Sequence, residues 1–172
     1  MKNLLLLAVA FLGLSFTYHA VSAWQIAEDY VIKFDGRGAT GTFSELTGEI
    51  IFDENDLANS RINVSVKTAT IETGNNTKNK HARGESWFDA ETYPTIGFTS
   101  EKFTKTATGY TVTGIFNMHG VEKQETILFT FENNIFNGKV TIDRQEYGIE
   151  GPFLAFTVAD DFAVEIRVPV RK

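Results

Sequence analysis

The sequence contains no cysteine, and this absence excludes several kinds of chemistry. A chain without thiols can form no disulfide, offers no cysteine nucleophile and cannot build a thiolate zinc site. Stability must therefore come from packing, which requires a substantial hydrophobic core.

Basic charge and long apolar runs are also scarce. The chain has 16 Lys and Arg against 22 Asp and Glu, a net charge of −6, and the basic residues are scattered among acidic ones. Binding a nucleic-acid backbone needs a basic stripe, so we expect no nucleic acid as a partner. Beyond residue 23 no stretch approaches the roughly 20 apolar residues that a membrane-spanning helix requires, so we expect no transmembrane segment in the mature chain.

The first 23 residues have the layout of a cleavable secretory signal peptide. Lys2 precedes an apolar stretch from Leu4 to Phe16, and the segment ends in small residues at Val21 and Ala23. We predict cleavage after Ala23, with residues 24–172 as the mature protein in the periplasm or outside the cell. That length suits one domain, and no linker, repeat or shift in composition divides it.

Alternation of apolar and polar residues dominates the predicted mature chain. In the last segment Phe162, Val164 and Ile166 interleave with Ala163 and Glu165, which is typical of a strand with one wet face. We count about eight such strands, separated by polar turns, and expect a short helical or irregular crossover over 76–88. The domain is therefore all-β and antiparallel, although periodicity alone leaves both a barrel and a sandwich open.

One glycine-rich motif resembles a dinucleotide fingerprint. Residues 36–41 fit G-x-G-x-x-G, but that motif works by opening a helix whose N-terminus holds the pyrophosphate. Here residues 42–52 have the pattern of two strands around Gly48. We therefore interpret the motif as a glycine-rich β connection.

Metal-binding and catalytic patterns are weak. The predicted mature chain has only His81 and His119, far apart, whereas a zinc site needs three or four ligands. The acidic runs 53–56 and 160–161 are typical of polar turns, and Ser86 has no obvious base nearby. We expect no metal, no cofactor and no nucleophilic catalysis, although two carboxylates could still meet at a barrel mouth.

Aromatic residues are abundant, with 15 Phe in the chain. An eight-stranded barrel is wide enough either to be filled by its own side chains or to hold one small ligand. Large rings on the inner face suit both outcomes.

Several motifs, taken in order, resemble the YceI-like family. The most specific are the Trp-Phe-Asp…Tyr-Pro-x-Ile-x-Phe block, which begins at Trp87, and the Met-His-Gly-Val turn, which begins at Met118. The motifs occupy residues 41–43, 48–53, 86–89, 93–100, 113–121 and 143–149.

The resemblance implies a lipocalin-like antiparallel barrel of eight strands with a short helical crossover. It also implies a lengthwise apolar channel that binds polyisoprenoids such as isoprenoid quinones or prenyl pyrophosphates, in a periplasmic or secreted protein. Many relatives carry a His-Ser pair before the first long strand, where this chain has residues 28–32, Glu-Asp-Tyr-Val-Ile. If that pair contacts the head group, the preferred ligand of this chain differs.

We therefore expect a ligand-binding protein, not an enzyme, that holds an isoprenoid lipid, with the crossover gating one end. A filled barrel that serves as an interaction module, an enzyme acting on a bound lipid, and a homodimer remain alternatives. A one-residue error of register would turn a whole strand's side chains outward. The expected lining is Phe43, Phe52, Trp87, Phe88, Phe98, Phe116, Phe129, Phe131, Phe136 and Phe156, with Arg37, His81, His119 and Arg144 as candidates to meet a polar or anionic head.

Overall fold

The computed structural model describes residues 23–152 and 155–172. The predicted signal peptide, apart from Ala23, lies outside the described residues. The described chain forms one large antiparallel sheet and one α-helix. Its strands are β1 (Gln25–Ile26), β2 (Val31–Gly36), β3 (Ala39–Phe43), β4 (Thr47–Ile51), β5 (Arg61–Lys67), β6 (Thr95–Thr106), β7 (Gly109–Met118), β8 (Val121–Glu132), β9 (Ile135–Asp143) and β10 (Asp161–Arg171), and its helices are α1 (Asn76–Arg83) and the short 3-10 turns η1 (Thr68–Thr70), η2 (Gln145–Tyr147) and η3 (Ala155–Thr157).

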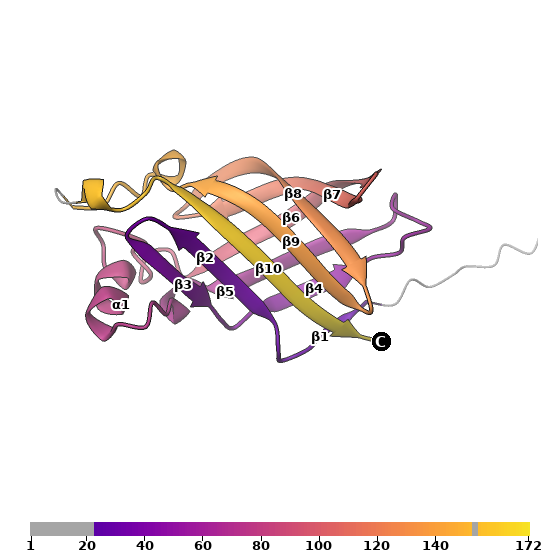
Figure 1. Ribbon diagram of the computed structural model, residues 1–172, viewed down its shortest axis with the longest axis horizontal. Coiled ribbons are helices and arrows are strands. Elements are labelled where there is room, and N and C mark those ends of the chain that lie inside the picture. The colour runs from indigo at the N-terminus through magenta and orange to yellow at the C-terminus, as the bar shows by residue number, and fades with distance from the viewer. Residues whose placement is uncertain (1–22, 153–154) are drawn as a thin grey trace, which may run out of the picture.

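The sheet curls strongly around one interior (Figure 1). Its strand order is β3-β2-β10-β9-β8-β7-β6-β5-β4, and β1 pairs with β10. Trp24, just before β1, bridges Ile50 of β4, and Thr42 of β3 bridges Glu72 after β5. These contacts draw the two edges of the sheet together, so the expected all-β antiparallel fold with a short helical crossover is confirmed.

Ten strands are present in the described residues, where we expected about eight, and one of the ten, β1, is only two residues long. The two strands that we expected around Gly48 are present as β3 and β4, but the break between them falls at residues 44–46, where Glu45 has a left-handed φ of 55°. Gly48, the expected breaking point, instead lies inside β4, where a Cβ would meet the backbone oxygen of Asn63.

The glycine-rich motif forms a β connection, as predicted. Gly36 ends β2, and Ala39 begins β3 after a turn at Arg37 and Gly38. The two strands pair as an antiparallel hairpin. A strand and not a helix follows the glycines, so this segment lacks the helix N-terminus that a dinucleotide-binding motif requires.

The core is divided between the two ends of the curled sheet. Phe52, which directly follows β4, is 2% exposed and lies among other aromatic rings. Toward the α1 end, Tyr147 is fully buried and its hydroxyl donates to Glu125 at 2.8 Å. Burial, and then this contact with Glu125, raise the pKa of Tyr147 far above its ordinary value.

Candidate ligand-binding site

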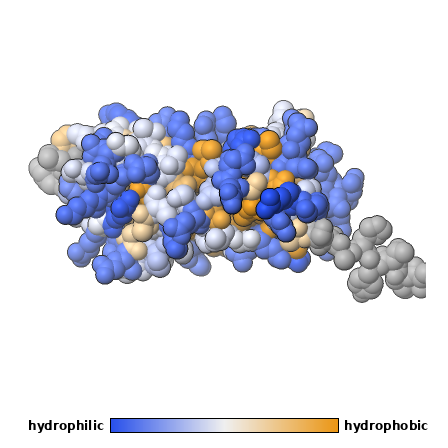
Figure 2. Space-filling model, turned by 90° about the horizontal axis from the view of Figure 1, so that it is seen from below, coloured by the Kyte–Doolittle hydropathy of each residue, from blue (hydrophilic) through white to orange (hydrophobic). Residues whose placement is uncertain are grey.

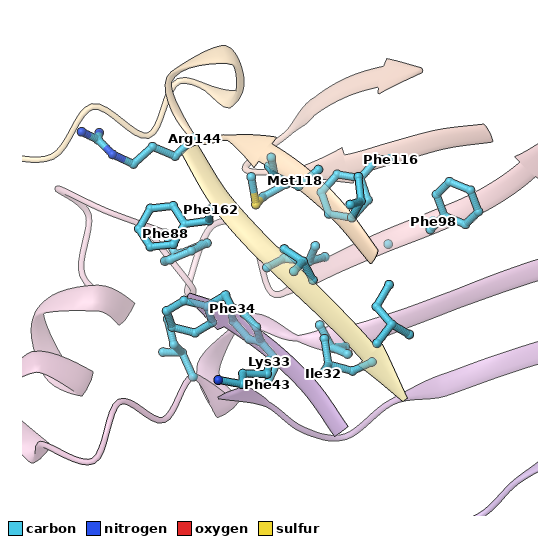
Figure 3. A pocket seen from close by; sticks show the side chains of 18 of the residues that line it. Ile32, Lys33, Phe34, Phe43, Phe88, Phe98, Phe116, Met118, Arg144 and Phe162 are labelled. Atoms are coloured by element: carbon cyan, nitrogen blue, oxygen red, sulfur yellow. The ribbon is translucent and has the colours of Figure 1, made fainter. Parts of the chain in front are cut away.

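A cavity of about 510 Å³ lies inside the curled sheet. Its wall is built from the inward-facing residues of the long strands, which alternate with polar residues on the outer face. Figure 3 shows Phe34, Phe88 and Phe162 gathered at one end of it and Phe98 toward the other. A volume of several hundred cubic ångströms is typical of small-molecule sites, so the sheet is not filled along its whole length.

The exposed residues among the described lining of the cavity are Gly38 of the β2–β3 turn, Lys78 and His81 of α1, and Thr157 of η3. We call this end the mouth. At the opposite end, which we call the closed end, Ile62 and Val64 are half-buried and the other lining residues are buried: Ile50, Phe98, Val112, Phe129, Phe136 and Val168.

The outer surface contrasts with the wall of this cavity. Figure 2 shows a mostly hydrophilic face, with apolar residues visible only in patches between hydrophilic ones. The long strands therefore separate a polar exterior from an apolar interior, as alternation predicts.

The charged side chains on the cavity wall are all basic. They are Lys33 of β2, Lys78 of α1 and Arg144 after β9, the imidazole of His81 lies on the same wall, and no Asp or Glu is among the described lining residues. The cavity thus favours a neutral or anionic group near its mouth, although the chain as a whole is acidic.

Helix α1 is anchored beside the mouth by a buried asparagine. Asn79 is 3% exposed, accepts from the Thr73 backbone at 2.8 Å and donates to the Glu72 carboxylate at 2.8 Å. Gly74 N–H also donates to Glu72, at 2.6 Å. The hydrogen bond from Asn79, followed by that from Gly74, lowers the pKa of Glu72 below its ordinary value.

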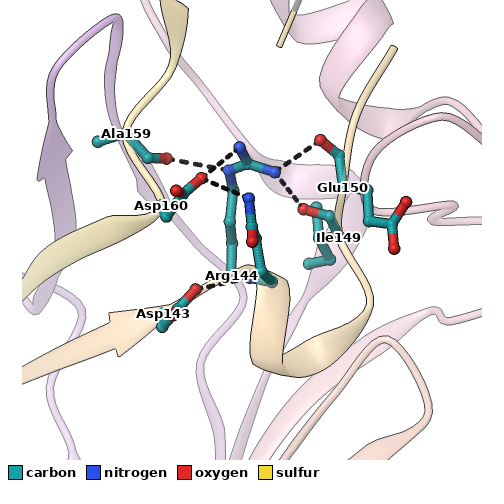
Figure 4. Close-up of polar contacts among 7 residues, drawn as sticks. Asp143, Arg144, Ile149, Glu150, Ala159 and Asp160 are labelled. Carbon is teal, nitrogen blue, oxygen red and sulfur yellow. Dashed lines mark hydrogen bonds and ion pairs between the residues drawn. The ribbon is translucent and has the colours of Figure 1, made fainter. Parts of the chain in front are cut away.

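Arg144 lies on the wall, but its hydrogen-bonding groups are committed to the protein (Figure 4). Its side chain, 5% exposed, donates to the carbonyl oxygens of Ala159 at 2.9 Å, Ile149 and Glu150 at 2.7 Å. It also pairs with Asp160 at 2.7 Å. Arg144 therefore holds the β9–β10 connection, and Asp160 is part of this network, not merely a solvated turn residue. The expected contact between Arg144 and a head group stays a prediction.

Seven of the ten expected aromatic residues lie on the cavity wall and three do not. Phe52 follows the end of β4 and Phe131 lies near the end of β8, so both fall beyond the closed end, among other rings. Phe156 is 69% exposed in η3, where strand alternation does not apply. The wall holds Phe43, Trp87, Phe88, Phe98, Phe116, Phe129 and Phe136.

Two of the four expected basic residues are displaced from the cavity. Arg37 is exposed in the β2–β3 turn and does not line it. His119 occupies the β7–β8 turn with φ of 55°, where its Nδ1 contacts the Tyr147 carbonyl oxygen at 3.1 Å and its ring lies 4.4 Å from Tyr93. His81 does lie on the wall.

Sequence reasoning missed much of the aliphatic wall and two lysines. Val64, Val140 and Ile166 were visible as alternating positions but were passed over in favour of rings. Lys33 gave no signal, because alternation with Ile32 and Phe34 predicts that it faces outward. Lys78 lies on the helical crossover, and only the placement of that helix brings it to the mouth.

In the described part of the chain, no group of three or more His, Asp or Glu residues is arranged to hold a metal ion. None of the described helices is long and apolar enough to cross a membrane.

Comparison with known proteins gives a family match. The family model of the YceI-like domain matches residues 24–170. A UPF0312 protein of Pseudomonas savastanoi is 31% identical over 152 residues, which cover 74% of this chain and 79% of that protein. UPF0312 proteins of Photorhabdus laumondii and Yersinia enterocolitica are 37% and 33% identical, but the matched segments span only 43% and 45% of their lengths.

Solved structures share the fold at low sequence identity. Burkholderia cenocepacia BcnA has a TM-score of 0.76 at 23% identity, covering 83% of this chain and 96% of its own. A polyisoprenoid binding domain from Saccharophagus degradans has a TM-score of 0.58 at 15% identity, covering 85% and 96%. At these sequence identities the solved structures show a shared fold and nothing more.

Proposed function

The chain belongs to the YceI-like family, and we propose that it is a binding protein that holds a long apolar lipid inside its curled sheet. The observation that carries the proposal is the cavity of about 510 Å³, with an apolar wall and one open end. An isoprenoid quinone or a prenyl pyrophosphate has a tail that suits such a wall. The structural neighbour described as a polyisoprenoid binding domain supports the same class of ligand.

The hydrophobic effect is large enough to account for binding through the tail. Burying about 20 carbons at about 0.8 kcal/mol each gives on the order of 16 kcal/mol. Association of the ligand with the protein, together with the ordering of its tail, costs about 4–15 kcal/mol. A useful affinity therefore requires no strong polar contact. The protein therefore acts by binding, with no covalent step.

The head group would lie at the mouth, beside Lys78 and His81. Both are exposed residues on the cavity wall, and both come from α1. A basic pair at this position favours a phosphate or another electron-rich head over a cationic one.

Export is part of the proposal and is supported by the predicted signal peptide at residues 1–23. A lipid with a long tail has little solubility in water, and a binding protein in the periplasm or outside the cell would keep it dispersed. The sequence pattern and the apolar cavity point to the same role.

Native mass spectrometry tests the proposal directly. The protein, purified from the exporting cell without detergent, is expected to carry a discrete adduct that extracts into organic solvent as a polyprenyl lipid. A protein that carries no adduct and leaves added isoprenoid quinone unbound would overturn the proposal, and a role in protein interaction would then lead.

A matched pair of variants tests whether the cavity is the site. Val140 lies on the cavity wall, whereas Val31 of β2 is exposed on the outer face. Val140→Trp is expected to obstruct the cavity and weaken binding at least tenfold, and Val31→Trp to leave the affinity unchanged. If the two folded variants bound the lipid with equal affinity, the binding site would not be this cavity.

A further inference from the structure

The interior of the sheet is hollow at the mouth and solid at the other end. The solid part is a group of rings that we call the ring cluster. Phe52 is its centre, with ring centroids between 5.2 and 5.9 Å from those of the other five members. The ring cluster consists of Phe52, Phe103, Tyr110, Phe129, Phe131 and Phe136.

Two members of the ring cluster form the floor of the cavity. Phe129 of β8 and Phe136 of β9 lie both in the cluster and on the cavity wall. The other four rings do not line the cavity. A lipid tail that enters from the mouth therefore meets the faces or edges of these two rings and goes no further.

The ring cluster is held in place at its far side. The Tyr110 hydroxyl donates to Glu54 at 2.6 Å, and the Trp24 ring nitrogen donates to the Phe52 carbonyl oxygen at 2.9 Å. Most of the ring pairs around Phe52 meet edge to face, which is a favoured geometry. Close-packed rings do not yield space without a cost, so a ligand would not simply push them aside.

The distance from mouth to floor sets a length. On β10 the cavity-lining residues run from Phe162 to Val168, and on β9 they run from Phe136 to Ile142. Six strand steps of about 3.3 Å measure roughly 20 Å along these strands, and a tail that lies parallel to β9 and β10 follows that length. An extended chain gains about 1.2 Å per bond, so a prenyl unit of four main-chain bonds covers about 5 Å.

We propose that the ring cluster acts as a ruler that limits the buried tail to about four prenyl units. This inference rests on the proposed function, since it concerns the same cavity. A longer tail leaves its excess outside the mouth, where it gains nothing from burial. The structure thus assigns tail-length specificity to Phe129 and Phe136, with Phe52 behind them.

The test uses delipidated protein and isoprenoid quinones that share one head group and carry tails of two to ten prenyl units. The affinity for the native sequence is expected to rise on the order of tenfold or more per unit up to about four units, and then to level off. An affinity that continues to rise through eight units would overturn the ruler.

Variants at the floor and at the mouth locate the limit. Phe129→Ala, with the milder Phe129→Leu in case the first does not fold, is expected to move the levelling point to longer tails by about one unit. Phe156→Leu, in η3 near the mouth but outside the cavity lining, is the control and is expected to leave that point unchanged. A levelling point that stays fixed in both folded Phe129 variants would also overturn the ruler.

The two proposals fail in different ways. If no tail of any length binds, the lipid-binding function itself is wrong. If every tail binds but affinity is independent of the ring cluster, only the ruler is wrong.

Discussion

At the scale of single residues, Arg144 is a charged side chain that lines a cavity and is held mainly by contacts within the protein. Its donors satisfy three backbone carbonyl oxygens and Asp160. We expect Arg144→Met to lower the free energy of unfolding by about 2–4 kcal/mol, because one buried and two partly buried carbonyl groups lose their donor. Urea denaturation measures the loss.

Arg61→Met is the matched control for that variant. Arg61 pairs with Glu49 at 3.3 Å, but the two side chains are 62% and 53% exposed. Such a pair contributes about 0–1 kcal/mol. If Arg144→Met proved no more destabilising than Arg61→Met, the contacts of Arg144 would not stabilise the fold, and a role in ligand binding would be favoured.

Two phenylalanines that the sequence does not distinguish have opposite roles. Phe52 is 2% exposed at the centre of the ring cluster, whereas Phe156 is 69% exposed. Phe52→Ala is expected to cost about 3–5 kcal/mol through lost burial and the cavity it leaves. Phe156→Ala should change stability by less than about 0.5 kcal/mol. Thermal or urea unfolding of the two variants gives the comparison, and similar losses would refute this view of the core.

At the scale of elements, α1 brings Lys78 to the mouth although its sequence carries no obvious binding motif. If the head group lies there, Lys78→Glu should weaken binding of a prenyl pyrophosphate by at least tenfold and of a neutral quinone by much less. Lys80 is also exposed on α1 but does not line the cavity, so Lys80→Glu is the control. Calorimetric titration of both ligands checks the result, and equal losses for the two heads would place the head group elsewhere.

The anchor of α1 predicts a dependence on pH. Hydrogen bonds, first from Asn79 and then from Gly74, hold the pKa of Glu72 below its ordinary value of 4.5. A lowered pKa means that the ionised carboxylate stabilises the fold, so this contribution is complete above pH 4.5 and is lost as the pH falls through the lowered value.

The Asn79 side-chain amide reports on that change. Its NMR resonance should shift on acidification with a midpoint below 4.5, as the carboxylate that accepts from it becomes protonated. Glu72→Gln should abolish the shift. A midpoint at or above 4.5 in the unmodified protein would show that the anchor does not favour the ionised form.

Elements were easier to predict from the sequence than the site. Period-two alternation marks the long strands, because one face is buried, and the polar run at 76–83 breaks that period where α1 forms. The division of β3 from β4 depends on the left-handed backbone of Glu45, which alternation does not reveal.

The site needed tertiary information. Alternation tells which way Phe131 and Phe129 point but not how far along the interior each lies, and only one of them reaches the cavity. The position of Phe156 is set by a 3-10 turn, and that of Lys78 by the docking of a helix. Distances along the interior come from the packing of strands that are remote in sequence.

At the scale of the whole molecule, one end of the curled sheet is packed for stability and the opposite end is hollow for binding. The ring cluster supplies dense packing away from the mouth, while the wall near α1 leaves apolar side chains half-buried around empty volume. Apolar residues that line an empty space lose the contacts that they would have in a filled core. A ligand tail restores those contacts, so the empty protein should be appreciably less stable than the filled one.

That difference can be given a size. A ligand that binds only the folded state at a concentration 100 times its Kd adds about 2.7 kcal/mol. For a domain of this length each kcal/mol raises Tm by about 2–4 °C, so saturation should raise it by about 5–11 °C. Scanning calorimetry of delipidated protein with and without an isoprenoid quinone measures the shift. Val140→Trp, whose larger side chain obstructs the same cavity, should show a much smaller shift. A shift as large in that variant as in the unmodified protein would mean that the tail is not held in this cavity.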